Sequence, residues 1–208
     1  YEYLQSGWHK IDGSWYYFAA DTKKSVPLVQ KENWVTMDGQ QYYFINGWTL
    51  ATGFQVIDGS YYYFDGTGAM TTDREFSPNG YWYRAKADGK LYWNEYYTAE
   101  DGTKYYYGVG VYRVSGWQRM ENAWYYFDTD GTMATGWKNI GGYYYYFQKD
   151  GARLEGYQNI DGSMYYIGSG GYRLTGWQWL SGRYHYFDVA TGKEAETKID
   201  ADYWATVD

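Results

Sequence analysis

The chain has 208 residues, of which 31 are Tyr, 12 are Trp and 8 are Phe, while Ile, Leu, Val and Phe together make up only about 15%. An aliphatic fraction this low is typical of disordered chains, but a packed Tyr or Trp buries about 150–250 Å² and can replace aliphatic side chains. We therefore expect a folded chain with an aromatic core. The 27 Gly residues, the 2 Pro residues and the mean hydropathy of −0.74 favour turns and strands over helices.

Composition and charge exclude several kinds of partner and site. The net charge of −7 and the pI of 4.8 argue against binding to a phosphate backbone, so we expect no nucleic acid partner. The lack of Cys excludes disulfides, thiol nucleophiles and Cys-ligated zinc. No apolar run reaches the roughly 18–20 residues of a membrane span, and the first residues do not resemble a signal peptide. We expect no membrane insertion and no cofactor, in a protein that is either cytosolic or longer than this chain.

An internal repeat runs through the whole sequence. Its opening aromatic residue recurs every 20 residues at Tyr97, Trp117, Trp137, Tyr157 and Trp177. The same series continues upstream at positions 74, 54, 34 and 8, with an insertion of 3 residues before Tyr97 and of 6 residues before Trp34, and a half unit starts near residue 197. We interpret residues 1–208 as a single array of about nine units.

Each unit is predicted to be a β-hairpin. With the opening aromatic residue counted as position 0, positions 4 and 5 carry turn pairs that supply the positive φ angles of a type I′ turn: Asp12-Gly13, Asp38-Gly39, Asp58-Gly59, Asp101-Gly102, Gly141-Gly142 and Asp161-Gly162. An aromatic strand such as Trp124-Tyr125-Tyr126-Phe127 and a second turn at Asp130-Gly131 follow. A single hairpin is not stable alone in water, so the fold class is an all-β solenoid, a superhelix of stacked β-hairpins.

The segment from Gly116 to Trp137 reads Gly-Trp, six residues, Trp-Tyr-Tyr-Phe-Asp, then Gly, Met and Thr-Gly-Trp. This pattern resembles the choline-binding, or cell-wall-binding, repeat of Gram-positive surface proteins and phage lysins. Two related families share it, the glucan-binding repeats of streptococcal glucansucrases and the short repeats of large clostridial glucosylating toxins. Segments such as residues 54–64 fit any of the three, which leaves the ligand open.

The resemblance implies that choline sits in aromatic cages between consecutive hairpins. Carried over to this sequence, the best cage is Trp117, Trp124 and Tyr145 with Met133, and the others are Trp8, Trp15 and Tyr42; Trp137, Tyr144 and Tyr165; and Phe54, Tyr61 and Trp82 with Met70. A trimethylammonium group gains about 0.5–2 kcal/mol from each well-placed ring. Three rings give roughly millimolar affinity, so useful binding requires several sites on one polymer.

Departures from the pattern keep other ligands open. Gln41, Lys104 and Met164 stand where a second ring of a cage is expected, which breaks those cages. Position 16, which is Met in the choline pattern, reads Leu50, Met70, Arg113, Met133, Arg153 and Arg173. An Arg repels a trimethylammonium group, whereas it can donate to a phosphate or a sugar hydroxyl. These arginines favour a phosphocholine contact or a carbohydrate ligand.

No catalytic motif is present, and the two histidines, His9 and His185, are far apart in a fold where contacts are between neighbours. Asp128-Thr129-Asp130-Gly131 begins like a calcium loop but lacks the distal Glu, so we interpret it as a turn and expect no metal site.

We therefore predict a non-catalytic module that binds choline or phosphocholine on teichoic acids of a choline-decorated cell-wall polymer. The alternatives are a module for an α-glucan or another cell-surface glycan, and a structural spacer without a small ligand. All three imply a secreted or cell-surface protein of a bacterium or phage, whose catalytic or toxin domain lies outside this chain. Exposed aromatic grooves also make a homodimer possible.

Overall fold

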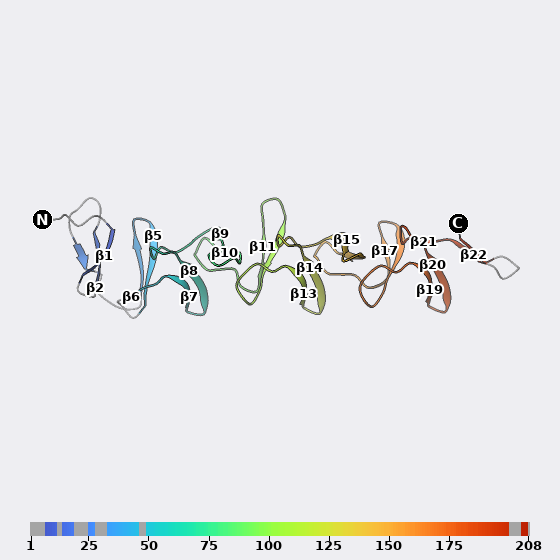
Figure 1. Ribbon diagram of the computed structural model, residues 1–208, viewed down its shortest axis with the longest axis horizontal. Coiled ribbons are helices and arrows are strands. Elements are labelled where there is room, and N and C mark those ends of the chain that lie inside the picture. Colours follow the sequence, from blue (N-terminus) through green and yellow to red (C-terminus); the bar gives the residue numbers. More distant parts are fainter. Residues whose placement is uncertain are drawn as a thin grey trace. The chain divides into compact units, whose positions relative to one another are not determined.

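The computed structural model describes residues 7–11, 14–18, 25–27, 33–45, 49–199 and 205–207 (Figure 1). All regular elements in these ranges are β-strands, and consecutive strands pair as antiparallel hairpins. The all-β hairpin fold predicted from the sequence is thus confirmed. The chain divides into two compact units, one made of residues 1–97 and 106–113 and the other of residues 98–105 and 114–208. Each unit is described by itself below.

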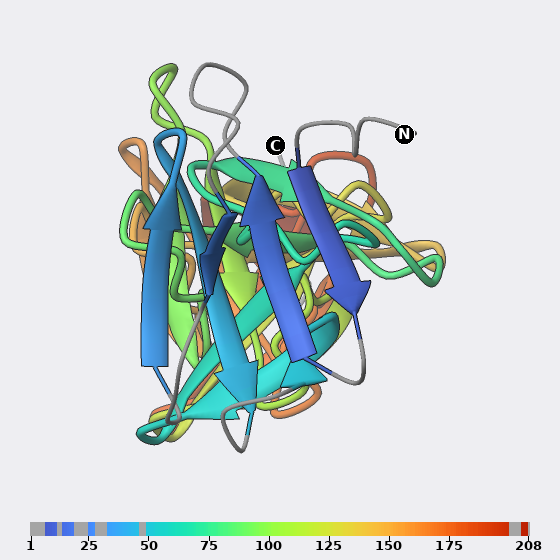
Figure 2. The same cartoon turned by 90° about the vertical axis from the view of Figure 1, so that its left-hand side faces the viewer.

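The first unit contains four successive groups of paired strands, whose N-terminal members are the blue elements in Figure 2. The strands are β1 (Gly7–Ile11), β2 (Ser14–Phe18), β3 (Ser25–Pro27), β4 (Asn33–Met37), β5 (Gln40–Ile45), β6 (Thr49–Leu50), β7 (Gly53–Ile57), β8 (Ser60–Phe64), β9 (Arg74–Phe76) and β10 (Tyr83–Ala85). β1–β3 and β4–β6 are three-stranded, because the linking segment after the hairpin adds a short strand, and the other two groups have two strands. The boundary between the units falls in the hairpin of β11 (Glu95–Thr98) and β12 (Lys104–Tyr107).

The second unit continues the same arrangement. Its strands are β13 (Gly116–Met120), β14 (Ala123–Phe127), β15 (Gly136–Ile140), β16 (Tyr143–Phe147), β17 (Gly156–Ile160), β18 (Ser163–Ile167), β19 (Gly176–Leu180), β20 (Arg183–Phe187), β21 (Glu194–Ala195), β22 (Thr197–Ile199) and β23 (Ala205–Val207). Each odd-numbered strand from β13 to β19 pairs with the next strand, β21 adds to β20, and β22 pairs with β23.

The turns of these hairpins have the backbone that a type I′ turn requires. Both central residues have positive φ at Asp58 (49°) and Gly59 (75°), and also at Glu121 (48°) and Asn122 (70°), where the sequence carries no Gly. The prediction is wrong at Asp101-Gly102, where only the Gly has positive φ. The turn at Asp12-Gly13 lies outside the described residues.

The register is the same in the hairpins β1–β2, β4–β5, β7–β8, β13–β14, β15–β16, β17–β18 and β19–β20, and the fourth hairpin keeps the same pairing but starts one residue late. The opening aromatic residue pairs with position 9, as in Phe54 with Tyr63 and Trp117 with Tyr126. In β9 and β10 the corresponding pair is Glu75 and Arg84. Glu75 therefore occupies the place of the opening ring, one residue after the position that the regular spacing predicts, because the linking segment between Met70 and β9 is one residue longer than in a regular unit.

Two backbone hydrogen bonds hold the linking segment, one to its own hairpin and one to the preceding hairpin. The N–H of position 17 donates to position 9 of its own hairpin, as Ala134 does to Tyr126 at 2.8 Å. The N–H of position 16 donates instead to position 7 of the preceding hairpin, as Arg153 does to Trp124 at 2.8 Å. The same bond from position 16 joins Met70 to Gln41, Leu91 to Tyr61, Arg113 to Trp82, Met133 to Lys104 and Arg173 to Tyr144. Stacking is thus specified by the backbone of the linking segment.

The core of each hairpin is the aromatic or aliphatic residue at position 10. Phe64, Tyr107, Phe127, Phe147 and Phe187 are all 0% exposed. Because side chains alternate along a strand, the residue at position 8 points to the same face as position 10. This places position 8 beside the core, where Tyr62 and Tyr165 are buried.

Candidate functional site

The rings of one hairpin meet a ring of the next in the segment with the strongest repeat pattern. Trp117 on β13 and Trp124 on β14 have ring centroids 6.2 Å apart and nearly perpendicular planes, at 87°. Tyr145, on β16 of the next hairpin, lies 4.8 Å from Trp117. The structure thus brings together the three rings expected there, and Trp124 keeps 38% of its surface exposed.

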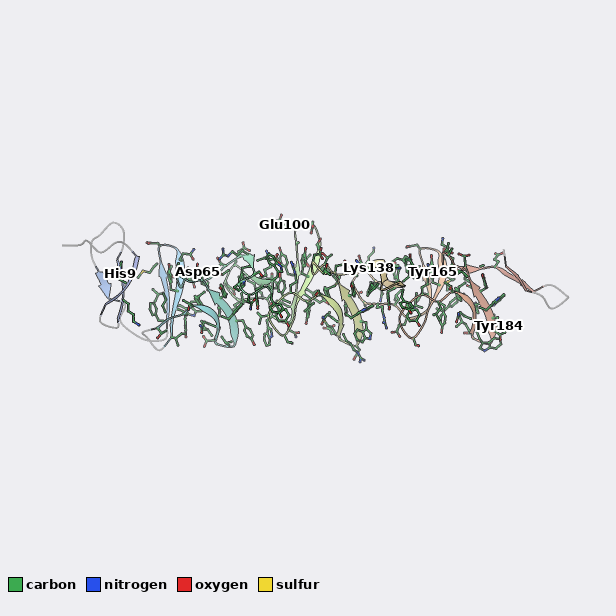
Figure 3. The ribbon with its side chains drawn as sticks, viewed as in Figure 1. His9, Asp65, Glu100, Lys138, Tyr165 and Tyr184 are labelled. Atoms are coloured by element: carbon green, nitrogen blue, oxygen red, sulfur yellow. The ribbon has the colours of Figure 1, made fainter. Side chains whose placement is uncertain are left out.

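A second group has the same form one hairpin later. Trp137 on β15 and Tyr165 on β18 have ring centroids 4.8 Å apart, at 59°. The third expected ring, Tyr144, is 44% exposed and carries the guanidinium of Arg173 over its face, with Cζ 4.6 Å from the ring centroid. Figure 3 labels Tyr165 among the side chains of this part of the chain.

At Phe54 the structure assembles a different set from the one expected. The ring of the next hairpin that contacts Phe54 is Tyr83, at 4.6 Å, in place of Trp82. Tyr61 packs against the same buried cluster as Tyr83 and Leu91. Trp82 belongs to the next group, where its carbonyl accepts the N–H of Arg113 at 2.7 Å and its ring lies 5.5 Å from the Arg113 guanidinium. The reason is that the fourth hairpin begins one residue later than the 20-residue spacing predicts, at Glu75.

The two methionines expected in these groups each lie one hairpin earlier. The N–H of Met133 donates to Lys104 and that of Met70 donates to Gln41, because position 16 is bonded to the preceding hairpin. Met70 and Tyr62 share one buried cluster, and Tyr62 lies 5.0 Å from Trp34. Although Gln41 replaces one ring of the Trp34 hairpin, Trp34 is therefore still grouped with the ring of Tyr62 and with Met70 from the next repeat.

The remaining expected group, Trp8, Trp15 and Tyr42, lies partly outside the residues whose side chains the structure describes. Trp8 is in β1 and Trp15 is in β2, where Trp15 pairs with Lys10, but their side chains are outside the described residues. Tyr42 is on β5, paired with Val35. The proximity of these three rings stays a prediction.

Arginine side chains at position 16 lie against the rings of the preceding hairpin. Arg153 places its guanidinium carbon 5.8 Å from the Trp117 centroid, donates to the carbonyl of Gly170 at 3.1 Å and pairs with Glu155. Only 9% of the Arg153 side chain is exposed. The sequence identified these arginines but placed each of them in the cage of its own hairpin. The hydrogen bond from the N–H of position 16 to the preceding hairpin, which the sequence does not reveal, places them one hairpin earlier.

The residue in the place of position 16 at the end of the second unit is polar. Glu194 on β21 is the strand partner of Phe187, and its carboxylate accepts a hydrogen bond from the Tyr157 hydroxyl and lies 2.5 Å from Nδ1 of His185. Arg183 Nε donates to Nε2 of His185 at 3.1 Å, so Nδ1 carries the proton that bonds Glu194. The pKa of Tyr157 is raised to about 12, first by partial burial and then by the hydrogen bond that its hydroxyl donates to Glu194 and by the charge of Glu194.

Neither a metal cluster nor a membrane span is found in the part of the chain that the structure describes. No group of three or more His, Asp or Glu side chains is placed to hold a metal ion there. The same residues include no helix that is long and apolar enough to cross a membrane. What the arrangement offers chemically is a series of electron-rich ring faces, which attract cations and stack on flat apolar surfaces.

Comparison with known families identifies the repeat. Residues 114–152 match the family described as choline-binding repeat, and residues 6–21 and 52–70 match the family described as putative cell wall binding repeat. The resemblance drawn from residues 116–137 is thereby confirmed. No curated protein sequence matches the chain.

Solved structures share the hairpin fold. Choline binding protein F of Streptococcus pneumoniae, solved in the presence of a peptidoglycan analogue, is 24% identical with a TM-score of 0.73, over 93% of this chain and 73% of that chain. The choline-binding domain of CbpL from S. pneumoniae is 26% identical with a TM-score of 0.61, over 85% of this chain and 98% of that chain. The autolysin LytC of S. pneumoniae, in complex with a synthetic peptidoglycan ligand, is 20% identical with a TM-score of 0.56, over 91% of this chain and 48% of that chain.

Proposed function

We propose that this chain is a non-catalytic cell-wall-binding module that recognises choline or phosphocholine of teichoic acids in aromatic cages between consecutive hairpins. The observation that carries the proposal is the close approach of rings from successive hairpins. The centroid distances are 5.0 Å for Trp34 and Tyr62 and 4.6 Å for Phe54 and Tyr83. Ring faces in this arrangement suit a trimethylammonium group, which has no hydrogen-bond donors.

The repetition of the cage explains how weak sites give useful attachment. Each ring contributes about 0.5–2 kcal/mol, so one cage reaches roughly millimolar affinity. A cell-wall polymer that carries many choline groups engages several cages at once, and the effective concentration of the second group raises the overall affinity by about 10²–10⁴-fold. This role places the protein at a bacterial cell surface or outside the cell, with a possible second copy of the chain as a further partner.

A carbohydrate ligand is the second candidate, and one surface favours it. On the hairpin of β19 and β20, Trp177, Trp179 and Tyr184 are 43%, 61% and 64% exposed, and the rings of Trp179 and Tyr184 are 4.7 Å apart. Figure 3 labels Tyr184 on this hairpin. Sugars stack on exposed rings of this kind, which would make the module glycan-binding.

Titration with choline separates the two candidates. Intrinsic Trp fluorescence and the melting temperature are followed as choline is added, with dextran, soluble starch and sodium chloride of matched ionic strength as controls. A saturable change at about millimolar choline that is reduced in Phe54→Ala supports the proposal. Val56→Ala is the matched control, because Val56 lies on the same strand and is 63% exposed. A response to glucan with none to choline would transfer the function to carbohydrate binding.

A further inference from the structure

The side chain at position 16 decides what each cage contains. Its backbone N–H is bonded to position 7 of the preceding hairpin, so its side chain starts beside the rings of that hairpin. In the first unit, the cage of Trp34 and Tyr62 receives Met70, and the cage of Phe54 and Tyr83 receives Leu91. Met70 is 5% exposed and Leu91 is 3% exposed, so each forms a buried apolar wall of its cage.

In the second unit, the same position carries arginines at residues 153 and 173, and both are held against the rings. Arg153 has its guanidinium carbon 5.8 Å from the Trp117 centroid, and Arg173 has its own 4.6 Å from the Tyr144 centroid. Both distances lie within the roughly 6 Å range of cation–π attraction. These two cages therefore already contain a cation.

Backbone carbonyls of the following turn hold each guanidinium in place. Arg153 donates to Gly170 at 3.1 Å, and Arg173 donates to Thr191 at 2.6 Å and to Ala190 at 3.3 Å. Added Cβ atoms would lie 2.0 Å from Arg153 at Gly171 and 2.2 Å from Arg173 at Gly192, so each arginine fills the space above a turn glycine.

The side chain of Arg153 is buried, so it excludes water from the side of the Trp117 cage that it covers. Its side chain is 9% exposed, and its buried Nε has no hydrogen-bond partner among the described residues. A buried N–H without an acceptor is costly in general. Here the aromatic face of Trp117 is the neighbouring group that attracts the positive charge.

We propose that Arg153 and Arg173 are built-in occupants of the Trp117 and Trp137 cages, which therefore reject choline, so that, among the cages whose side chains the structure describes, recognition is left to those of Phe54 and Trp34, where position 16 is apolar. This inference rests on the proposed function and assigns specificity to position 16. An entering trimethylammonium group would have to displace a guanidinium that is tethered to the cage wall and hydrogen-bonded to the next turn. The cage with the best repeat pattern is then not a choline site in the native chain.

Replacement of the arginine tests the proposal. Arg153→Met introduces the side chain that the Trp34 cage already accommodates at Met70. The indole N–H signals of Trp117 and Trp124 are followed by NMR during a choline titration, after assignment with single Trp→Phe variants. In the native chain they are expected not to move. In Arg153→Met they are expected to shift with a dissociation constant of about 10⁻³ M, at least about tenfold below any value in the native chain.

Three control variants make the result specific. Arg119→Met removes the same charge from an exposed position of β13 and is expected to leave both indoles unmoved. Arg153→Lys keeps a cation in the cage and is expected to keep it closed. Arg173→Met is an independent second test, read at the Trp137 indole, in case Arg153→Met does not fold.

Each outcome decides the inference separately from the proposed function. Shifts of Trp117 and Trp124 in the native chain would overturn the inference and leave the proposed function standing. Shifts only in Arg153→Met support the inference, and with no response at either the Phe54 or the Trp34 cage in the native chain they would overturn the proposed function alone. Silence in folded Arg153→Met and Arg173→Met overturns the inference, whatever the Phe54 cage does.

Discussion

The backbone N–H of Arg153 and the carbonyl oxygen of Trp124 form a 2.8 Å hydrogen bond between consecutive hairpins. Because of this bond, the linking segment of one hairpin lies beside the rings of the preceding one. A repeat therefore cannot be assigned a ligand from its own residues alone. Its position 16 acts on the hairpin before it, and the rings at positions 0 and 7 receive the side chain of the hairpin after it.

Truncation at position 10 should destabilise the fold most. Phe64 is 0% exposed, so Phe64→Ala removes a fully packed ring and leaves a cavity, at a cost of about 3–5 kcal/mol of unfolding free energy. Urea unfolding followed by near-UV circular dichroism measures the change. Val56→Ala, in the same hairpin at a 63% exposed site, should change the free energy by no more than about 0.5 kcal/mol. Equal effects of the two variants would contradict the assignment of position 10 as the core.

The local parts of this structure could be predicted from the sequence, and the cages could be predicted only in part. Hairpins and turns follow from residues that are close in the chain, as with Asp58 and Gly59. The contact of Phe54 with Tyr83 depends on where the next hairpin begins, because one additional residue in the linking segment before β9 moves every residue of that hairpin by one place. The placement of Met133 beside Lys104 depends on a bond that no residue type encodes, since any residue except proline supplies the N–H.

A turn glycine provides a prediction about backbone strain alone. Gly142 has φ of +89°, and an added Cβ would meet no atom within 4 Å. Gly142→Ala should therefore cost about 1–2 kcal/mol through the left-handed backbone and not through a clash. Gly66 is the matched control, because it also has open space and does not have a left-handed φ. Gly66→Ala should be neutral or stabilise by about 0.4–1 kcal/mol, and thermal unfolding of both variants checks the difference in sign.

The hydroxyl of Tyr107 should stabilise the first unit. It donates to Glu75 at 2.5 Å in a place where Tyr107 is 0% exposed, and Arg113 pairs with the same carboxylate at 3.3 Å. Tyr107→Phe should lower the unfolding free energy by about 1.5–3 kcal/mol, the range for a hydrogen bond to a charged group.

A second tyrosine serves as the control for that variant. The hydroxyl of Tyr106 donates to Asn94 at 2.5 Å at an exposed site. Tyr106→Phe should cost at most about 0.5–1 kcal/mol, because water replaces the lost bond. A larger loss in Tyr106→Phe than in Tyr107→Phe, measured by urea unfolding, would be inconsistent with a stabilising role for the buried network.

Ionisation of Tyr157 should make the second unit less stable at alkaline pH. Its pKa is raised from 10.0 to about 12 by partial burial and by the bond that its hydroxyl donates to Glu194. Between these two pH values the folded chain holds a proton that the unfolded chain has lost. The stability that comes from the raised pKa of Tyr157 is therefore complete below pH 10 and decreases as the pH rises toward 12. Tyr157→Phe removes the ionisable group, and its unfolding free energy should therefore decrease less over this interval than that of the native chain. Urea unfolding at closely spaced pH values measures the difference between the two chains, and parallel curves would show that the Tyr157 hydroxyl is not bonded to Glu194 in solution.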